Sequence, residues 1–178
     1  ELPEYGEGVY EPEFRKYYYL GGSTARGKTN SVLCFDGIRK EWKKMAPLVE
    51  SRSSFGSCLM KTSEGSSIVL AGGLNDPNQP MKECEVYDPR GSGSIKIRPL
   101  NFAASNCCVC AFGKDTVYKF GGLANGGGRQ QICPIIERYS RSQGEWVFLN
   151  ADIFFPQDLG ESYRLFFANS RAIQINPS

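Results

Sequence analysis

Short apolar runs, bounded by turn residues, recur along most of the chain. Three of these runs, at residues 16–20, 67–71 and 116–120, lead directly into a pair of glycines. The second glycines of the pairs, Gly22, Gly73 and Gly122, lie about fifty positions apart, and a fixed period of that size indicates a structural repeat. Aliphatic, aromatic and β-branched residues dominate the runs, and none extends into the apolar periodicity of a helix. The pattern therefore predicts a repeated, all-β protein.

Each repeat continues in the same order. After a polar loop, a second apolar run closes on an aromatic residue and a turn, at 32–37, 84–89 and 135–140. A third run opens with Glu41-Trp42 in the first repeat and with Glu145-Trp146 in the last. Another short run lies before the second and third glycine pairs, at 57–60 and 108–112. We therefore predict four short strands in each repeat, separated by turns.

The copies differ at several positions. The first strand of the first repeat would have to be the short, polar segment 6–10. In the second repeat, Ile95 or Ile97 is expected where the other repeats carry tryptophan, and Ser140 replaces the aspartate in the third. Residues 172–175 are expected to begin another repeat.

These features resemble the kelch family of β-propellers. In that family Gly-Gly closes the second strand of a four-stranded blade, Tyr-Asp closes the third and Trp opens the fourth, as in Gly72-Gly73, Tyr87-Asp88 and Trp42. The likeness covers residues 16–150 and implies three four-stranded blades plus the start of a fourth. The implied boundaries are 1–52, 53–104 and 105–150 for the repeats, and 151–178 for a connection and the first strand of a further blade.

Three blades are fewer than a closed propeller ring normally contains. Propellers close roughly four to eight blades into a ring, and closure protects the edges of the sheets. We therefore expect this chain to be part of a larger propeller. Completion by a second copy and capping by another protein are the alternatives.

The amino-acid composition limits which functions the chain can have. The chain has no histidine, which removes the commonest general base and the imidazole metal ligands, so we expect no enzyme, no catalytic residue and no cofactor. Seven cysteines, an odd number, favour free thiols and a cytoplasmic location, with association with the cytoskeleton left open. A net charge of +2 is far below that of a typical nucleic-acid-binding domain, so we expect no nucleic-acid partner. No apolar run is long enough to span a membrane.

Two local motifs suggest other chemistry. Residues 22–29 fit the phosphate-binding P-loop pattern, but a β-branched and aromatic run follows where that loop must open a helix. Cys107, Cys108 and Cys110, with Cys133, suggest a metal site, but adjacent strand residues point to opposite faces and no second ligand pair has the right spacing. We expect a blade connection and packed thiols instead, and no metal.

One face of the implied propeller is the expected binding surface. With four antiparallel strands per blade, the loops between strands two and three emerge beside the connections between blades, and kelch adaptors bind peptides on that face. Arg52 also matches the family's arginine ahead of strand one. The expected partner-binding residues are polar and suit an extended or acidic peptide: Arg26, Lys28, Asn30, Arg52, Asn75, Asn78, Asn101, Asn125, Arg129 and Gln130.

The resemblance favours a non-enzymatic protein-interaction module, such as a scaffold of a cytoskeletal or ciliary assembly, whose partners are another protein and the remaining blades. Substrate recognition for a cullin-type ubiquitin ligase is an alternative, and such a receptor would need BTB-like sequence upstream. From another class, a carboxylate-based isomerase or lyase on a kelch propeller remains open, and a P-loop nucleotide binder is disfavoured.

Overall fold

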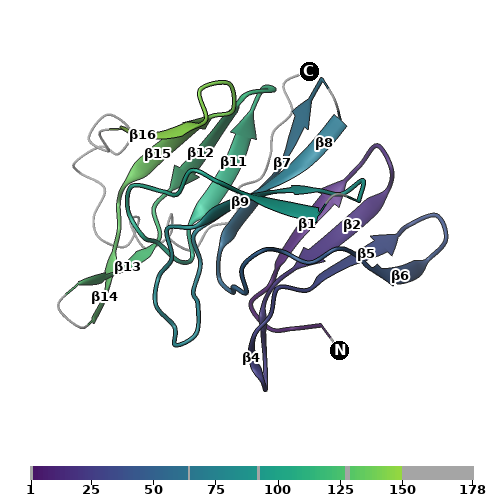
Figure 1. The fold of residues 1–178 in the computed structure, drawn as a ribbon, viewed down its shortest axis with the longest axis horizontal. Helices are drawn as coiled ribbons and strands as arrows, with labels where there is room; N and C mark the ends of the chain where they lie inside the picture. Colours follow the sequence, from purple (N-terminus) through teal and green to yellow (C-terminus); the bar gives the residue numbers. More distant parts are fainter. Residues whose placement is uncertain (1, 64, 92, 127–128, 150–178) are drawn as a thin grey trace, which may run out of the picture.

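The chain folds into three antiparallel four-stranded sheets, which a computed structural model describes for residues 2–63, 65–91, 93–126 and 129–149 (Figure 1). Blade 1 contains β1 (Glu7–Glu11), β2 (Lys16–Leu20), β5 (Val32–Asp36) and β6 (Glu41–Lys44). Blade 2 contains β7 (Gly56–Thr62), β8 (Gly65–Ala71), β9 (Cys84–Asp88) and β10 (Gly93–Ile97). Blade 3 contains β11 (Cys108–Phe112), β12 (Thr116–Phe120), β15 (Ile136–Ser140) and β16 (Glu145–Leu149).

The order of strands confirms the predicted fold. In each blade the strands lie side by side in chain order, and the first strands β1, β7 and β11 are neighbours at the inner edge. Residues 6–10, short and polar as they are, largely form β1, because the Tyr-rich strand β2 pairs with it along its whole length. The expected strand at 172–175 lies outside the described residues.

Two small hairpins extend the loops between the second and third strands. In blade 1 the hairpin is β3 (Ser23–Thr24) with β4 (Gly27–Lys28), and in blade 3 it is β13 (Leu123–Gly126) with β14 (Arg129–Ile132). Both project at the lower edge of Figure 1. Residues 22–29, which match the P-loop pattern, thus form a hairpin and not the N-terminus of a helix.

The hydrophobic core lies between blades. One buried cluster joins blade 1 to blade 2 through residues such as Tyr18, Leu20 and Tyr87, and a second joins blade 2 to blade 3 through residues such as Val69, Val117 and Trp146. Cys108 and Cys110 lie on the inner strand β11, and all seven thiols are free. The part of the chain that the structure describes has no helix that could cross a membrane.

Rows of side chains across each sheet show which face packs on the preceding blade. In blade 3, Val117, Tyr139 and Trp146 are opposite one another and buried, and the Trp146 indole donates to the carbonyl oxygen of Arg98 in blade 2 at 3.0 Å. The equivalent row of blade 1 is Tyr10, Tyr17, Phe35 and Trp42. No preceding blade covers that row among the described residues, so Trp42 is 48% exposed whereas Trp146 is 6% exposed.

The tryptophan position of blade 2 differs from the sequence prediction. Ser94, and neither Ile95 nor Ile97, is opposite Tyr87 in the way that Trp146 is opposite Tyr139. The Ser94 hydroxyl donates to the buried Glu85 carboxylate. Ile95 points to the other face and is 63% exposed, because successive residues of a strand alternate between faces.

The glycine pairs hold neighbouring blades together. Gly22 and Gly73 donate their backbone N–H groups to the carbonyl oxygens of Arg52 and Ala104, both at 2.8 Å, and each acceptor belongs to the connection that enters the next blade. Both residues of each pair have positive φ, at 59° and 108° in blade 1 and 64° and 110° in blade 2. A Cβ on Gly21 would lie 2.6 Å from the Arg52 carbonyl oxygen, so only glycine fits this contact.

Candidate binding face

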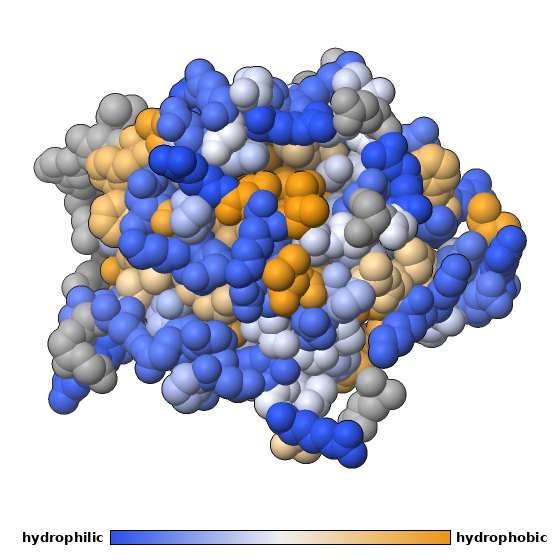
Figure 2. Space-filling view, viewed as in Figure 1, coloured by the Kyte–Doolittle hydropathy of each residue, from blue (hydrophilic) through white to orange (hydrophobic). Residues whose placement is uncertain are grey.

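Loops from all three blades meet on one side of the molecule, here called the loop face. It consists of the segments between second and third strands, 21–31, 72–83, 121–126 and 129–135, and the connections between blades, 45–55 and 98–107. The lower edge of Figure 2, where the hairpins project, is mostly hydrophilic. Hydrogen bonds join neighbouring loops: the Lys28 backbone N–H donates to Asp76 at 2.9 Å, and the Asn125 side chain donates to Gln79 at 2.7 Å.

Buried carboxylates on the third strands fix the connections between blades. Glu137 is fully buried and accepts hydrogen bonds from the backbone N–H groups of Asn101 and Phe102, and from the Asn101 side chain. Glu85 occupies the same strand position in blade 2 and accepts the N–H groups of Val49 and Glu50. A buried carboxylate needs such donors, so Glu85 fixes the path of the connection 45–55 and Glu137 that of the connection 98–107.

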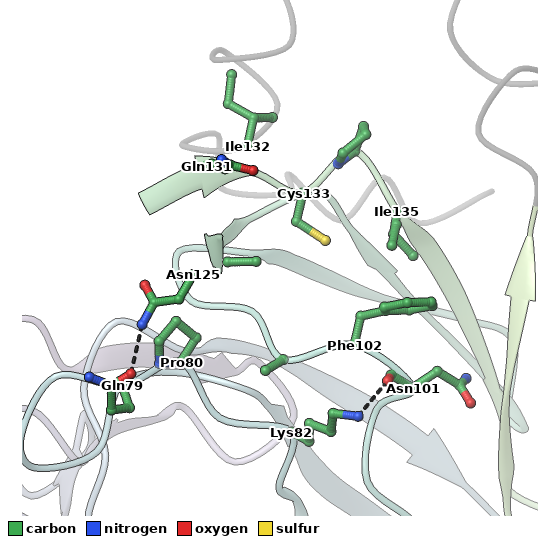
Figure 3. Close-up of a pocket in the computed structure, with 13 residues that line it drawn as sticks. Gln79, Pro80, Lys82, Asn101, Phe102, Asn125, Gln131, Ile132, Cys133 and Ile135 are labelled. Atoms are coloured by element: carbon green, nitrogen blue, oxygen red, sulfur yellow. Dashed lines mark hydrogen bonds between the residues drawn. The ribbon is translucent and has the colours of Figure 1, made fainter. Parts of the chain in front are cut away.

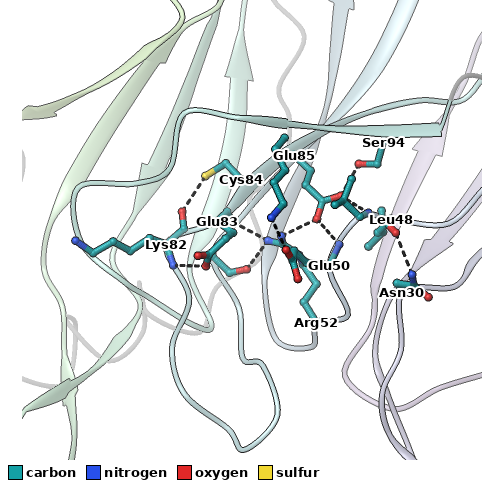
Figure 4. A network of polar contacts seen from close by, with 12 residues as sticks. Asn30, Leu48, Glu50, Arg52, Lys82, Glu83, Cys84, Glu85 and Ser94 are labelled. Atoms are coloured by element: carbon teal, nitrogen blue, oxygen red, sulfur yellow. Dashed lines mark hydrogen bonds and ion pairs between the residues drawn. The ribbon is translucent and has the colours of Figure 1, made fainter.

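Arg52 lies at the centre of a buried network on blade 2 (Figure 4). Its guanidinium forms an ion pair with Glu85 at 2.7 Å and donates to the carbonyl oxygens of Gly72 and Glu83. The loop position of Arg52 predicts partner binding, but its side chain is fully buried and does not reach the surface. Because the guanidinium bonds to Gly72, Glu83 and Glu85 inside the protein, we do not include Arg52 among the proposed partner-binding residues.

Blade 3 carries its buried cation at a different position of the repeat. Ala104 occupies the position of Arg52, and the cation comes instead from Lys119 on β12. Lys119 is fully buried, lies opposite Glu137, and donates to the carbonyl oxygen of Ile135 at 3.3 Å. Ile135 stands two residues before Glu137, as Glu83 stands before Glu85, so the two cations serve equivalent carbonyl groups.

The other predicted residues fall into two groups. Arg26, Asn78, Arg129 and Gln130 are exposed on the loops, and Lys28 is half-buried at the end of its hairpin. Asn30, Asn75 and Asn101 instead use their side chains within the protein: Asn30 donates to the Leu48 carbonyl, Asn75 accepts from the Gln79 N–H, and Asn101 donates to Glu137 and to the Trp146 carbonyl. The ten residues share a face but do not form one site.

A groove on the loop face, here called the Lys82 groove, separates blade 2 from blade 3 (Figure 3). It has a volume of about 400 Å³ and is formed by residues 79–82, the connection 101–103 and segments 124–125 and 131–135. Pro80, Phe102, Ile132 and Pro134 provide apolar walls. Asn101 and Asn125 are the only predicted binding residues among those that line it.

Lys82 and Phe102 line this groove and are absent from the predicted binding residues. Lys82 is exposed, and its ammonium donates to the Asn101 carbonyl oxygen at 2.8 Å. The N–H groups of Asn101 and Phe102 are held by Glu137, so the buried carboxylate positions the carbonyl that in turn positions Lys82. Following the second loop to the start of β9 would have included Lys82 in the prediction. Phe102 has no comparable signal in the sequence.

Burial in this fold affects the reactivity of the cysteine thiols. Burial raises the pKa of Cys107 to about 11 and that of Cys84 to about 12, which disfavours the reactive thiolate. Within residues 2–149, apart from the few that are not described, no three Cys, Asp or Glu side chains are grouped to hold a metal ion.

Comparisons with known proteins agree with the repeat. No family model matches the chain. Kelch-like protein 25 of Homo sapiens is 30% identical over 114 residues, which is 61% of this chain and 19% of that protein. Kelch-like protein 23 of Homo sapiens is 30% identical over 111 residues, 62% of this chain and 18% of that protein, and kelch-like protein 41a of Danio rerio is 35% identical over 72 residues, 40% and 11%.

The chain thus spans less than a fifth of the length of each of these relatives. The four-stranded blades, the glycine pairs that join them and the kelch-like relatives agree with one another. The chain is similar to kelch-repeat proteins and forms three four-stranded blades of a kelch-type β-propeller.

Proposed function

We propose that this chain is part of a non-enzymatic protein-interaction module that binds a protein partner on its loop face. The observation that supports this proposal most directly is the joining of loops from successive blades, through Lys28 with Asp76 and Gln79 with Asn125, into one polar surface. Rigid strands carry these loops, and binding residues are commonly found on loops that a rigid scaffold positions. Arg26, Lys28, Asn78, Asn125, Arg129 and Gln130 are the proposed contacts.

Further blades are the second class of proposed partner. The aromatic row of blade 1 has the same position as rows that are buried against a neighbour in blades 2 and 3. We therefore propose that another blade of the same propeller covers Tyr10, Tyr17, Phe35 and Trp42 in the complete ring. The repeat boundaries 1–52, 53–104, 105–150 and 151–178 remain predictions.

Two finer roles are compatible with a loop-face module. One is a cytoplasmic scaffold of a cytoskeletal or ciliary assembly, and the other is substrate recognition for a cullin-type ubiquitin ligase. Recovery of BTB-like sequence in the longer gene product would favour the ligase role, and co-purification with cytoskeletal filaments would favour the scaffold role.

Site-specific photo-cross-linking in cells tests the proposal. A photoreactive phenylalanine analogue replaces Asn78 or Gln130 on the loop face, or Lys114 in the turn between β11 and β12 at the other ends of the strands. All three positions are exposed, so they match in accessibility. We expect the first two variants to capture the same partner and the Lys114 variant to capture none. Capture at Lys114 alone would contradict the proposal.

A further inference from the structure

The Lys82 groove combines apolar walls with an available positive charge. The Lys82 ammonium uses one of its three N–H groups on the Asn101 carbonyl oxygen, and within the described ranges no carboxylate forms an ion pair with it. Figure 3 shows the Lys82 side chain leading to Asn101 on one side of the groove, and the Gln79–Asn125 pair on another. The groove therefore retains donors for a ligand.

The acidic residues nearest in sequence to the groove are used elsewhere. Glu137 is buried beneath the connection and accepts from Asn101 and Phe102. The Glu83 carboxylate accepts the backbone N–H of Lys82 at 3.1 Å and is not paired with the ammonium of that residue. No acidic side chain is among those that line the groove, so its charge favours an anionic ligand.

An aromatic side chain lies beside this charge. Phe102 is 44% exposed, and its ring packs against that of Phe148 in a T-shaped arrangement with centroids 6.0 Å apart. Pro80 and Pro134 have no N–H to offer and present only apolar surface and carbonyl groups. A ligand that fits must therefore bring an apolar group together with its anionic group.

We propose that the Lys82 groove binds a side-chain carboxylate of an extended partner segment, next to an apolar side chain that packs on Phe102. This inference rests on the proposed loop-face function and specifies its ligand. The carboxylate accepts from the Lys82 ammonium and from the Gln79 amide, whose oxygen is already bonded to Asn125. Partial burial between prolines and phenylalanine strengthens this charge-assisted bond relative to one in open solvent.

The test uses the full chain and four labelled decapeptides in a Ser/Gly background. Their central pair is Leu-Asp, Leu-Asn, Leu-Lys or Ala-Asp, and fluorescence polarisation measures each Kd. We expect the Leu-Asp peptide to bind about tenfold more tightly than the Leu-Asn peptide, since a hydrogen bond to a charged group contributes roughly that much. The Ala-Asp peptide tests the apolar contact with Phe102 and is expected to bind more weakly than Leu-Asp.

Protein variants test whether the Lys82 ammonium is the group that binds the peptide carboxylate. Lys82→Met keeps the aliphatic stem and removes the charge, and we expect it to abolish the difference between Leu-Asp and Leu-Asn. Lys114→Met removes an exposed lysine from the opposite turn and is expected to preserve that difference. Thermal unfolding of both variants checks that the fold is intact.

Three results would overturn the inference: equal affinities for Leu-Asp and Leu-Asn, binding of Leu-Asp that Lys82→Met leaves unchanged, or no binding of any peptide. These results are separable from a failure of the proposed function. Cross-linking through Asn78 and Gln130 with no carboxylate preference would reject the ligand of the Lys82 groove alone. Cross-linking only through Lys114 would reject the loop-face function itself.

Discussion

At the scale of single residues, blades 2 and 3 each bury a cation beside the third strand that carries Glu85 or Glu137. In blade 2 Arg52, on the connection, forms an ion pair with Glu85. In blade 3 Lys119, on the second strand, lies opposite Glu137 and donates to the Ile135 carbonyl oxygen. The position opposite Glu85 is Leu70, and the position of Arg52 in blade 3 is Ala104. The cation and the uncharged side chain have thus exchanged positions between the two blades.

This exchange predicts a rescue. Arg52→Ala leaves Glu85 buried without its cation and is expected to destabilise the chain by about 3–5 kcal/mol. Adding Leu70→Lys rebuilds the arrangement of blade 3, and we expect the double variant to recover part of the loss. Urea unfolding of the wild type, both single variants and the double variant forms a double-mutant cycle.

The single variant Leu70→Lys is the control for the cycle. It buries a second cation beside Glu85, which is already paired with Arg52, and is expected to lower the free energy of unfolding. If the double variant is no more stable than Arg52→Ala alone, Lys119 does not perform the role of Arg52.

At the scale of strands and rows, the two tryptophans occupy one position of the repeat in different surroundings. Trp146 is buried against blade 2, packs on Tyr139 with ring centroids 5.2 Å apart, and donates to the Arg98 carbonyl. Trp42 packs on Phe35 at 5.3 Å but is half exposed. The same residue type at the same register therefore contributes unequally to stability.

The two tryptophans form a matched pair of variants. We expect Trp146→Ala to lower the free energy of unfolding by about 3–5 kcal/mol, because it opens a cavity between blades. Trp42→Ala should cost about 1 kcal/mol or less, since solvent already reaches the ring. Denaturant unfolding monitored by far-UV circular dichroism measures both. Equal losses would contradict the inequality of the two faces.

Several elements follow directly from the sequence, and others depend on contacts that a linear pattern does not contain. Periodic runs predicted β2, β11 and β12 with their observed bounds. Ser94 was missed because the prediction matched Ile95 and Ile97 by hydrophobicity, whereas the register with Tyr87 decides which side chain faces the neighbouring blade. Similarly, the missing aspartate at Ser140 is compensated from another turn: Asp115 accepts from Ser140 and from the Ser142 N–H, and these hydrogen bonds lower its pKa.

The position of the loop face was predicted in outline, and the binding contacts proposed on it change in detail. Loop topology is enough to group the loops on one side, since it depends only on strand order. Whether a polar loop residue faces solvent or a buried carboxylate depends on tertiary contacts: the Arg52 side chain is buried against Glu85, whereas Asn101 is exposed and also donates to Glu137. Lys82 lies near the end of its loop and Phe102 in the middle of its connection, and the groove between them depends on how blades 2 and 3 pack.

At the scale of the whole molecule, the ionisation of buried thiols makes stability depend on pH. Burial raises the pKa of Cys84 to about 12 and that of Cys107 and Cys110 to about 11. An unfolded thiol ionises near about pH 8.5. The folded chain therefore binds more protons than the unfolded chain between these values, and its stability is full below about pH 8.5 and falls as pH rises toward 11.

Replacing one buried thiol tests this coupling. Cys107→Ala removes a thiol whose ionisation costs the wild type about 3 kcal/mol of stability across this range, so the stability of the variant should decline less steeply with pH. The difference between the two proteins at neutral pH measures the lost packing, and we expect that difference to shrink in alkaline solution. Parallel declines in urea unfolding from neutral pH to about pH 11 would contradict the assignment.

The glycine pairs have a consequence for how the chain folds. Gly22 completes its backbone hydrogen bonding only when the Arg52 carbonyl arrives with blade 2, and Gly73 only when Ala104 arrives with blade 3. Each blade thus gains stability from its neighbour, as in a one-dimensional cooperative array. Hydrogen exchange should accordingly be slowest in the middle blade, which has a neighbour on both sides, and opening should start from a terminal blade and advance one interface at a time.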